Sequence, residues 1–443
     1  MAAASSGQRF HLSPGGALRG RLRVPGDKSI SHRAIMLGSI ADGETEISGF
    51  LEGADALATL GAFRQLGVQI DGPEGGRVRI RGVGRDGLRG ADGPLDMGNS
   101  GTSMRLLSGL LAGQRFASTL IGDASLSRRP MRRVTGPLAE MGAQIATTEE
   151  GTAPLRITPT PELAGIDYRL PVASAQVKSS LLLAGLYARG RTCVTEPAPT
   201  RDHTERMLAA FGYPLTRDGA RVCLEGGGRL RGCRLEVPAD ISSAAFFLVG
   251  ASIAPGSDLT LEHVGINPTR TGVIDILRAM GADIRIEAER DVGGEPVADL
   301  RVRSAPLRGI RIPEALVPLA IDELPAVFIA AACAEGETVL TGAEELRVKE
   351  SDRIQVMADG LARLGIEAEP RPDGIRIRGG TPGADGARAV IESHGDHRIA
   401  MSFAIAALRA AGPIEIEDCA NVATSFPRFA TLAGGVGLQI REG

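Results

Sequence analysis

The feature that most constrains the fold of this chain is an internal repeat. A unit made of a polar opening, an apolar helix, a Gly turn and an alternating strand recurs six times, roughly every 65 to 80 residues. The openings begin at Pro25, Leu95, Pro171, Pro238, Pro318 and His394, and the Gly turns lie at Gly43, Gly113, Gly190, Gly256, Gly336 and Gly412. A second helix in each unit ends at Gly67, Gly142, Gly212, Gly281, Gly365 and Gly437. Each unit is therefore predicted to be βαβαββ.

Six units that divide three and three predict two pseudo-threefold domains in an α/β (α+β) fold. The sixth copy ends before its last strand, and the N-terminal segment 17–24 (ALRGRLRV) is predicted to supply that strand. Domain I would then comprise residues 1–24 and 239–443, and domain II residues 25–238, with a double crossover between them. An open solenoid is the alternative, but solenoid repeats usually run about 20–50 residues. We expect a ligand to lie in the cleft between the two domains.

Composition argues against several classes of protein. A formal net charge of −3 and 43% apolar residues are typical of a soluble globular protein without affinity for nucleic acid. No apolar run reaches the roughly 18 residues of a membrane helix, and the N-terminus lacks the apolar core of a secretion signal. The five cysteines are odd in number and form no C-x-x-C motif, which argues against a disulfide framework and favours the cytoplasm. The histidines and cysteines show no metal-ligand spacing.

Lysine is used at only three of the 50 basic positions. Lys28 lies in PGDKSISHR, Lys178 in SAQVKSS and Lys349 in RVKESDR, and each segment is polar and opens a helix. An ammonium group is a compact charge that can exchange a proton, whereas guanidinium is a permanent planar fork. These positions therefore predict functional lysines, with chance retention as the alternative for any single one.

The polar openings predict a binding site for a small anion. Helix N-termini carry unsatisfied N–H groups and partial positive charge, so several of them in one place favour a polyanionic ligand. Ser29 and Arg33 are four residues apart and share a helical face, as are Lys349 and Arg353. Helix capping with a surface ion pair is the alternative for one such pair, but repetition across openings favours ligand binding. The basic run around Arg129 has no interleaved aromatic residues, which argues against nucleic acid.

The openings resemble those of the 3-phosphoshikimate 1-carboxyvinyltransferase family, the enolpyruvyl transferases of the shikimate pathway. The resemblance spans essentially the whole chain and rests on PGDKSISHR (25–33), GNSGTSMRL (98–106), SAQVKSS (174–180), RVKESDR (347–353) and DHRIAM (396–401). It implies two domains of three βαβαββ units each, and transfer of enolpyruvyl from phosphoenolpyruvate to the 5-hydroxyl of shikimate 3-phosphate. It also implies no metal and no cofactor, and we expect a monomer.

The resemblance assigns roles to individual residues. It implies that shikimate 3-phosphate is bound by Lys28, Ser29, Arg33, Ser174, Ala175, Gln176, Arg201, Asp322 and Lys349. It implies that phosphoenolpyruvate is bound by Lys28, Gly101, Arg129, Gln176, Arg353 and Arg398. Asp322 is the expected general base toward the hydroxyl, and Glu350 or Lys28 the expected proton donor to C3. Gly101 leaves room beside phosphoenolpyruvate, so sensitivity to the inhibitor glyphosate is expected.

Two departures and two competing functions accompany this resemblance. Thr424 stands where some members have lysine in a K-T-F-P segment, and Ala175 where many have a second serine. An enolpyruvyl transferase that acts on a UDP-sugar would share the fold, but its relatives carry a reactive cysteine in the loop that here reads GDASLSRRP (122–130). A non-catalytic repeat scaffold is the second alternative, and it would not need the charges at the openings.

Overall fold

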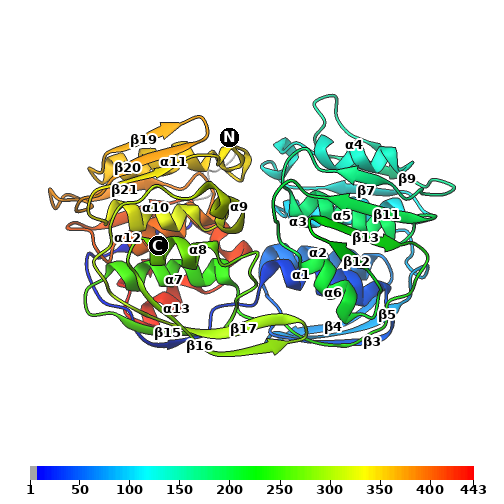
Figure 1. Ribbon diagram of the computed structural model, residues 1–443, viewed down its shortest axis with the longest axis horizontal. Helices are drawn as coiled ribbons and strands as arrows, with labels where there is room; N and C mark the ends of the chain where they lie inside the picture. The colour runs from blue at the N-terminus through cyan, green and yellow to red at the C-terminus, as the bar shows by residue number, and fades with distance from the viewer. Residues whose placement is uncertain (1–6) are drawn as a thin grey trace. The chain divides into compact units, whose positions relative to one another are not determined.

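The computed structural model describes residues 7–443 and divides into two compact units (Figure 1). Unit 1 comprises the chain up to Pro25, Pro238–Asp291 and Pro296–Gly443. Unit 2 comprises Gly26–Val237 together with Val292–Glu295. Val292–Glu295 differs from the sequence-based prediction, which assigned it to domain I. Residues 1–6, part of the segment in which no secretion signal was predicted, lie outside the described residues.

Unit 2 contains three four-stranded sheets of one topology. The first has the order β14 (Arg234–Glu236), β3 (Asp42–Ser48), β5 (Arg77–Val83), β4 (Gln69–Glu74). The second has the order β6 (Leu95–Asp96), β7 (Ser118–Ile121), β9 (Leu155–Thr158), β8 (Gln144–Ala146). The third has the order β10 (Asp167–Arg169), β11 (Arg191–Thr195), β13 (Arg221–Glu225), β12 (Thr216–Asp218). In every sheet the first two strands pair in parallel and the others antiparallel.

The helices of unit 2 are α1 (Lys28–Ile40), α2 (Ala54–Gln65), α3 (Gly101–Ala112), α4 (Arg132–Glu140), α5 (Ala175–Gly185) and α6 (His203–Ala210). Almost every residue of α1, α3 and α5 after the first turn is buried, so these three helices form the centre of the unit. Small residues allow that close packing. A Cβ atom on Gly109 of α3, for example, would lie 2.0 Å from the backbone oxygen of Ser180 on α5.

Unit 1 repeats this plan with one variation. Its first sheet has the order β16 (Asp283–Val292), β17 (Glu295–Arg303), β15 (Asp258–Gly265), β2 (Arg19–Leu22). Its second has the order β21 (Ala389–Glu392), β22 (Ile414–Glu417), β1 (Phe10–Leu12), β23 (Ile440–Glu442). The third has only three strands, in the order β18 (Glu337–Leu340), β20 (Gly374–Arg378), β19 (Ala368–Arg371). Two isolated parallel bridges, Arg308 with Glu335 and Arg311 with Val339, stand where the other sheets have their parallel strand.

The strand that completes the sixth copy is β1, not the segment 17–24 that the sequence predicted. Phe10–Leu12 pairs antiparallel with both β22 and β23. The predicted segment instead contains β2, which pairs in parallel with β15 of the fourth copy. The prediction was wrong because ALRGRLRV shows the clearer alternation, whereas the short run FHL has too few residues to show a pattern.

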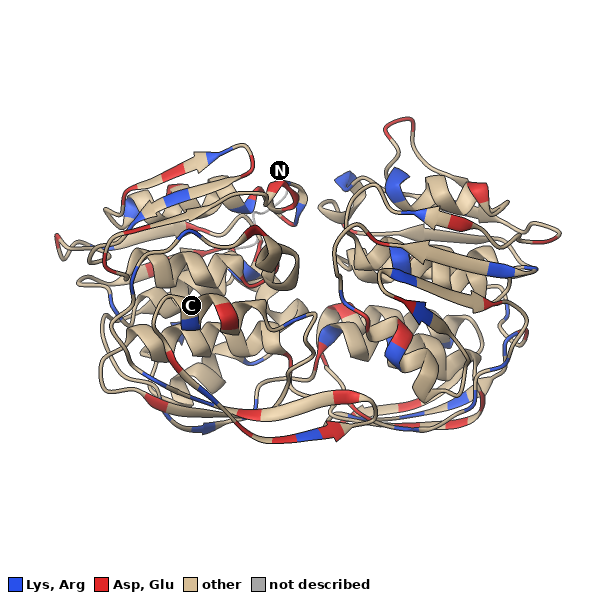
Figure 2. Ribbon diagram, in the orientation of Figure 1, with Lys and Arg blue, Asp and Glu red and all other residues tan. Residues whose placement is uncertain are grey.

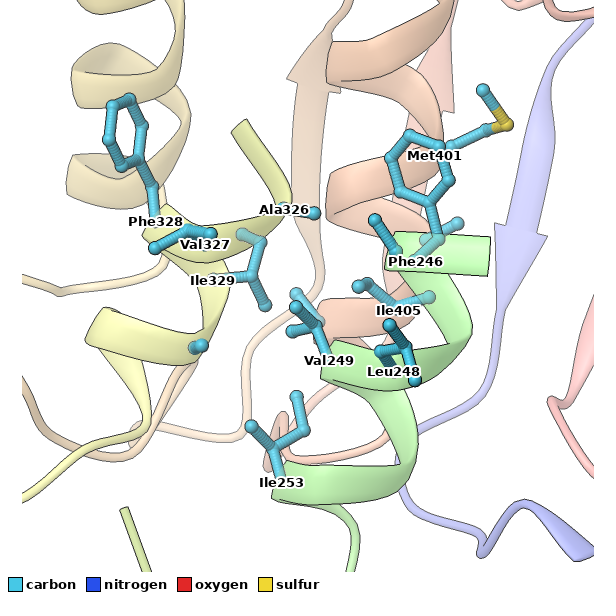
Figure 3. Packing of buried hydrophobic residues seen from close by; sticks show 14 of the residues in the cluster. Phe246, Leu248, Val249, Ile253, Ala326, Val327, Phe328, Ile329, Met401 and Ile405 are labelled. Carbon is cyan, nitrogen blue, oxygen red and sulfur yellow. The ribbon is translucent and has the colours of Figure 1, made fainter. Parts of the chain in front are cut away.

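The core of unit 1 is built on α7 (Ile241–Ile253), α10 (Leu324–Ala332) and α12 (His397–Ala406). Figure 3 shows Val249 of α7 facing Ile329 of α10, with Ile405 of α12 on its other side. Burial of each such side chain contributes about 1.5–3 kcal/mol. Neither α7 nor α10 contains a charged residue (Figure 2). The charges at the helix openings are therefore not needed for this packing.

Four further helices complete unit 1: α8 (Gly272–Ala279), α9 (Val317–Ala320), α11 (Arg353–Arg363) and α13 (Phe429–Gly435). Within residues 7–443, no single helix combines the length and the apolar character needed to cross a bilayer. One bent pair, Glu314–Ala320 with Leu324–Ala332, satisfies that test by length and composition alone.

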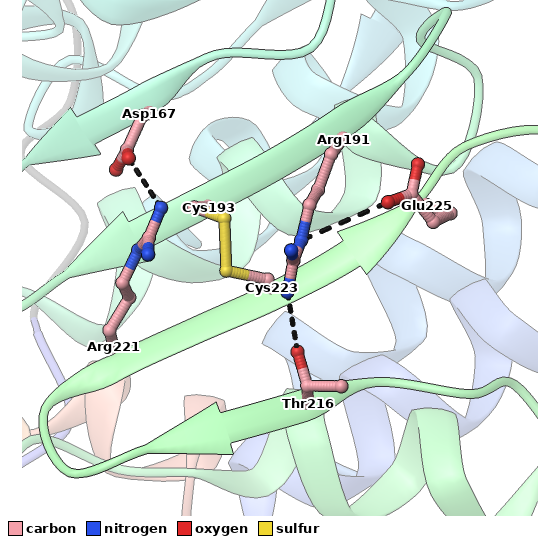
Figure 4. The surroundings of a disulfide bond; sticks show 7 residues. All are labelled: Asp167, Arg191, Cys193, Thr216, Arg221, Cys223 and Glu225. Carbon is pink, nitrogen blue, oxygen red and sulfur yellow. Dashed lines mark hydrogen bonds and ion pairs between the residues drawn. A yellow bond between two sulfur atoms is a disulfide. The ribbon is translucent and has the colours of Figure 1, made fainter.

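A disulfide joins Cys193 of β11 to Cys223 of β13, contrary to the argument from the odd number of cysteines (Figure 4). The two residues are directly opposite one another in the antiparallel ladder, with their Cα atoms 4.1 Å apart. Cys233, Cys333 and Cys419 are free thiols. The register of the two strands brings the cysteines together. They are 30 residues apart in the chain, and the sequence does not indicate that register. In Figure 4, Arg191 and Arg221 bind carboxylates of the same sheet, Arg191 at 3.8 Å from Glu225.

Candidate functional site: two polar clusters at helix openings

The predicted site residues form two polar clusters, one in each unit. The unit 2 cluster consists of Lys28, Ser29, Arg33, Gly101, Arg129, Ser174, Ala175, Gln176 and Arg201. The unit 1 cluster consists of Asp322, Lys349, Glu350, Arg353 and Arg398. Both lie at or beside the first turns of helices, where the sequence predicted them.

The openings of α1, α3 and α5 are polar partly because each needs a cap. The side chain of Asp27 accepts a hydrogen bond from the N–H of Ile30 at 2.8 Å, and Ser100 caps α3 in the same way. Ser174 caps α5 and accepts from Val177 at 3.4 Å. Capping satisfies one N–H group per helix, and the partial positive charge of the N-terminus remains.

Arg33 is the buried cation at the centre of the unit 2 cluster. Its Nε donates to Thr204 Oγ1 at 2.7 Å, its Nη2 to Ser179 Oγ at 2.8 Å, and its Nη1 to the backbone oxygen of Ser29 at 2.9 Å. These three hydrogen bonds orient the guanidinium. The bonds also fix α1 against α5 and α6.

Lys28 lies at the start of the same helix and pairs with Asp55. Its Nζ is 2.9 Å from Asp55 Oδ2, and the two side chains are 17% and 8% exposed. Sequence reasoning missed Asp55, which lies in the first turn of α2. Acidic residues are common in first turns because they complement the helix dipole, so its position carried no specific signal.

Gln176 joins α5 to α3. Its Oε1 accepts from Arg105 Nη1 at 2.7 Å, and its Nε2 donates to Thr102 Oγ1 at 3.1 Å. Sequence reasoning also missed Arg105. It lies four residues after Gly101, the spacing of Ser29 and Arg33 on α1, and applying that pair's logic to the second opening would have found it.

Gly101 lies in a confined position between two guanidinium groups. A Cβ atom there would be 3.0 Å from Arg105 Nη1 and 3.2 Å from Arg129 Nη1. Arg129 is 8% exposed and donates from Nη2 to Asn99 Oδ1 at 2.7 Å. This hydrogen bond holds Arg129 beside Asn99, which precedes the cap of α3 in the chain. A side chain at position 101 would therefore crowd both guanidinium groups.

Arg201 lies in the loop 196–202 between β11 and α6, and it is partly exposed. The preceding residue, Thr200, donates to Glu196 Oε2 at 2.6 Å within that loop. Arg201 therefore lies in a loop that a buried hydrogen bond between Thr200 and Glu196 stabilises.

A buried neutral histidine lies below the unit 2 cluster. His32 Nδ1 is 2.8 Å from Thr59 Oγ1, which is 2.7 Å from Ser103 Oγ. Burial, and then the charges of Lys28 and Arg33, lower the pKa of His32 well below its ordinary value. The ring stays neutral at pH 7 and adds no cation to the cluster.

The unit 1 cluster is organised around Arg353, which is 1% exposed. Its Nε lies 2.8 Å from Asp396 Oδ2, its Nη2 lies 2.6 Å from Glu350 Oε2, and its Nη1 lies 3.3 Å from Asp322 Oδ1. Arg353 therefore holds two predicted site carboxylates and a third, Asp396, that sequence reasoning did not assign to the site. The side chain of Asp396 also caps α12 by accepting from the N–H of Arg398 at 2.9 Å.

Lys349 and Arg398 complete this cluster around Asp322. Lys349 Nζ is 3.8 Å from Asp322 Oδ1 and 3.6 Å from Glu345 Oε1. Arg398 Nη1 donates to the backbone oxygen of Asp322 at 2.9 Å. All five predicted residues of unit 1 therefore meet at Asp322 or Arg353.

Opposite charges keep the buried ions of unit 1 charged. Burial opposes the charged form of Arg353, but Asp396, Glu350 and Asp322 outweigh it and raise the pKa of the guanidinium. Burial likewise opposes charge on Asp396, and the guanidinium of Arg353 outweighs it, so the pKa of Asp396 is lowered. Within residues 7–443, no three His, Cys, Asp or Glu side chains are grouped so as to hold a metal ion.

Comparison with known proteins identifies the relatives of this chain. The family model of EPSP synthase (3-phosphoshikimate 1-carboxyvinyltransferase) matches residues 12–432. A protein of that name from Alkalilimnicola ehrlichii is 74% identical over 98% of this chain and 97% of its own length. One from Methylococcus capsulatus is 72% identical over 97% and 98%. The structure of EPSP synthase from Acinetobacter baumannii matches with a TM-score of 0.88 at 61% identity, covering 98% of this chain and 100% of that one. An enolpyruvyl transferase from Streptomyces tendae, 16% identical, shares the fold with a TM-score of 0.79 over 99% of each chain.

Proposed function

Because the chain belongs to the EPSP synthase (3-phosphoshikimate 1-carboxyvinyltransferase) family, we propose that its two polar clusters are the substrate-binding and catalytic groups of enolpyruvyl transfer. The chain transfers the enolpyruvyl group of phosphoenolpyruvate to the 5-hydroxyl of shikimate 3-phosphate and releases phosphate, a step of the shikimate pathway. The assignment of each residue is the proposal.

The unit 2 cluster binds the phosphate groups in this proposal. Shikimate 3-phosphate lies against the openings of α1 and α5, where Lys28, Arg33 and Arg201 supply positive charge. Ser29, Ser174, Ala175 and Gln176 supply the first turns of those helices and their polar side chains. The single observation that carries this assignment is that the guanidinium of Arg33 is buried where α1, α5 and α6 meet, and that three hydrogen bonds to Ser29, Ser179 and Thr204 fix its orientation. A buried guanidinium in that setting favours an anion as its ligand.

Phosphoenolpyruvate lies beside Gly101 in this proposal. Lys28, Arg129, Gln176, Arg353 and Arg398 are the other residues assigned to its binding. Gly101 contributes backbone N–H and free space rather than a side chain. Glyphosate occupies the same space, and the missing Cβ is why we expect inhibition.

Asp322 is the general base of the proposed mechanism. Its carboxylate takes the proton of the 5-hydroxyl while that oxygen attacks C2 of phosphoenolpyruvate. The C2–C3 double bond opens and C3 takes a proton from Glu350 or Lys28, which gives a tetrahedral ketal phosphate. In the second step C3 returns a proton, the C2–C3 double bond re-forms, and phosphate leaves with the electron pair of its C–O bond. Lys349 and Arg353 orient Asp322 for the first step.

The surroundings of Glu350 suit acceptance of the proton that C3 returns in the second step. Its Oε2 is 2.6 Å from Arg353 Nη2, so the carboxylate is fixed in place beside a cation that this proposal puts on phosphoenolpyruvate. The same guanidinium then stabilises negative charge that develops as phosphate departs. We further propose, from the sequence, that the chain works as a monomer in the cytoplasm and uses no cofactor.

Phosphate release tests the residue assignment. The chain should release phosphate with shikimate 3-phosphate plus phosphoenolpyruvate, and should not when a UDP-sugar replaces shikimate 3-phosphate. Arg129→Gln should raise the KM for phosphoenolpyruvate by about 30- to 100-fold, the loss of a charge-assisted hydrogen-bond pair. Arg128→Gln is the matched control, because Arg128 is the exposed neighbour in the chain. Equal KM values for the two variants would contradict the assignment.

A further inference from the structure

Lys178 is the one lysine that the two clusters do not use. Its side chain is 1% exposed, so it does not reach a ligand. Nζ lies 3.1 Å from Glu196 Oε2 and 2.7 Å from Glu205 Oε1, and both carboxylate side chains are nearly buried, at 3% and 6% exposure. One buried ammonium thus holds two buried carboxylates.

These ion pairs join elements that carry cluster residues. Lys178 lies on α5, one turn after its cap Ser174, and Glu205 lies in the first turn of α6. The next position on α5 repeats the contact, because Ser179 Oγ is 2.7 Å from Thr204 Oγ1. Ser179 also accepts from Arg33 Nη2 at 2.8 Å. Two neighbouring contacts therefore join the openings of α5 and α6: the Lys178–Glu205 ion pair and the Ser179–Thr204 hydrogen bond. Arg33 binds to the second of these contacts.

Lys178 also anchors the loop that presents Arg201. Glu196 begins this loop directly after β11, and it accepts from Thr200 Oγ1 at 2.6 Å. Arg201 follows Thr200 in the chain. The position of its backbone is therefore set by Glu196, and Glu196 is held by Lys178.

A lysine suits this position better than an arginine. The two carboxylate oxygens approach one nitrogen atom from two elements, which fits a compact ammonium rather than a planar fork. Without the ammonium, two buried carboxylates would face each other, and each would move toward water or take up a proton. Movement toward water displaces the loop 196–202 or α6 from α5, and proton uptake removes the charge on which both ion pairs depend.

We propose that Lys178 is a positioning residue for shikimate 3-phosphate, acting through Arg201 on one side and through the Ser179–Arg33 contact on the other. This inference rests on the proposed function, in which Arg33, Ser174 and Arg201 bind that substrate. It predicts that Lys178 controls affinity for one substrate more than for the other, although it touches neither.

The test compares two variants in steady-state kinetics and in equilibrium titration with shikimate 3-phosphate. Lys178→Met should raise both the Kd and the KM for shikimate 3-phosphate by about tenfold or more. With shikimate 3-phosphate saturating, the KM for phosphoenolpyruvate and kcat should change by less than about threefold. The double variant Lys178→Met/Glu205→Gln has the same buried charge balance as the wild type, so it should bring the affinity for shikimate 3-phosphate back to within about threefold.

Arg201→Gln separates the possible failures. If Arg201→Gln lowers affinity for shikimate 3-phosphate while a folded Lys178→Met does not, the positioning inference is wrong and the proposed site stands. If Arg201→Gln has no effect either, the proposed site is wrong at this residue. If Lys178→Met does not fold, the double variant is the only test. In that case, an affinity of the double variant for shikimate 3-phosphate below about a tenth of the wild-type affinity would overturn the charge-balance argument. Equal changes for both substrates, with a lowered Tm, would indicate a purely structural role.

Discussion

The unit 1 and unit 2 clusters occupy equivalent helix openings but differ in charge. In unit 2, Arg33, Arg105 and Arg129 donate hydrogen bonds to hydroxyl, amide and backbone oxygens. In unit 1, Arg353 alone binds three carboxylates, and Lys349 lies near two. Similar helix ends can therefore hold arginines through hydroxyl, amide and backbone oxygens, as in unit 2 beside the Lys28–Asp55 pair, or in an ionic network of several carboxylates, as in unit 1.

The difference suggests a division of labour within one reaction. In unit 2, hydroxyl, amide and backbone oxygens orient the arginines, which suits the phosphate binding proposed for them. The carboxylates of unit 1 reduce its attraction for anions but provide groups that can accept and return protons, which the chemical step requires. Substitutions in unit 1 should therefore lower kcat most, and substitutions in unit 2 should change affinity most.

Asp322→Asn should have the largest effect. The amide keeps the shape of the side chain and its place beside Arg353, but it cannot accept the hydroxyl proton. We expect kcat to fall by about 100- to 10,000-fold while affinity for shikimate 3-phosphate, measured by titration, changes much less. Asp359→Asn, at an exposed position on α11, is the control and should keep full activity. A fall in affinity without a fall in kcat would reverse the roles assigned to the two clusters.

Gly101→Ala should have an intermediate effect, confined to ligands that lie beside α3. The added methyl would stand 3.2 Å from Arg129 Nη1 and narrow the space proposed for phosphoenolpyruvate and glyphosate. We expect the inhibition constant of glyphosate to rise by about tenfold or more, with a smaller rise in the KM for phosphoenolpyruvate. Gly136→Ala on α4 adds the same methyl group where no atom lies within 4 Å, and it should change neither constant. Equal inhibition constants for wild type and Gly101→Ala would refute the steric explanation.

The smallest expected effect concerns pH and compares the buried titrating groups of the two units. The pKa of His32 is lowered by folding, so the unfolded state binds more protons below about pH 6.5, and unit 2 should lose stability as the pH falls from there. The pKa of Asp396 is also lowered, but its stabilising contribution is lost only as the pH falls below about 3.9. Unit 2 should therefore weaken at a higher pH than unit 1.

Urea unfolding of His32→Asn and wild type at pH 7.5 and 5.5 measures this effect. Between pH 7.5 and pH 5.5, the free energy of unfolding of the wild type should fall by about 1 kcal/mol more than that of the variant, because asparagine does not titrate. The difference between the two proteins, rather than either curve alone, removes the contribution of other groups. An equal loss in both would mean that folding does not lower the pKa of His32, which would contradict this explanation.

The repeat was enough to predict the fold, because it appears as periodic glycines. The polar openings interrupt an apolar pattern and predicted an anion site, whereas the individual residues of both clusters were assigned through the family resemblance. Partners that carry no such pattern were missed. Asp55 looks like an ordinary first-turn acid, and the two carboxylates of Lys178 lie in segments with no motif. The Cys193–Cys223 pair and the pairing of β1 depend on register between distant strands, which a single sequence does not display. The cleft between domains stays a prediction.

The pairing of β1 has a consequence for synthesis on the ribosome. Unit 2 is almost contiguous in the chain, so its sheets can form once Val237 has emerged. Phe10–Leu12 emerges first but pairs with Ile414–Glu417 and Ile440–Glu442, which are translated last. Its backbone N–H and C=O groups therefore lack their native partner strands for nearly the whole of translation. The N-terminal strand is consequently the part of the nascent chain with most need of protection from aggregation.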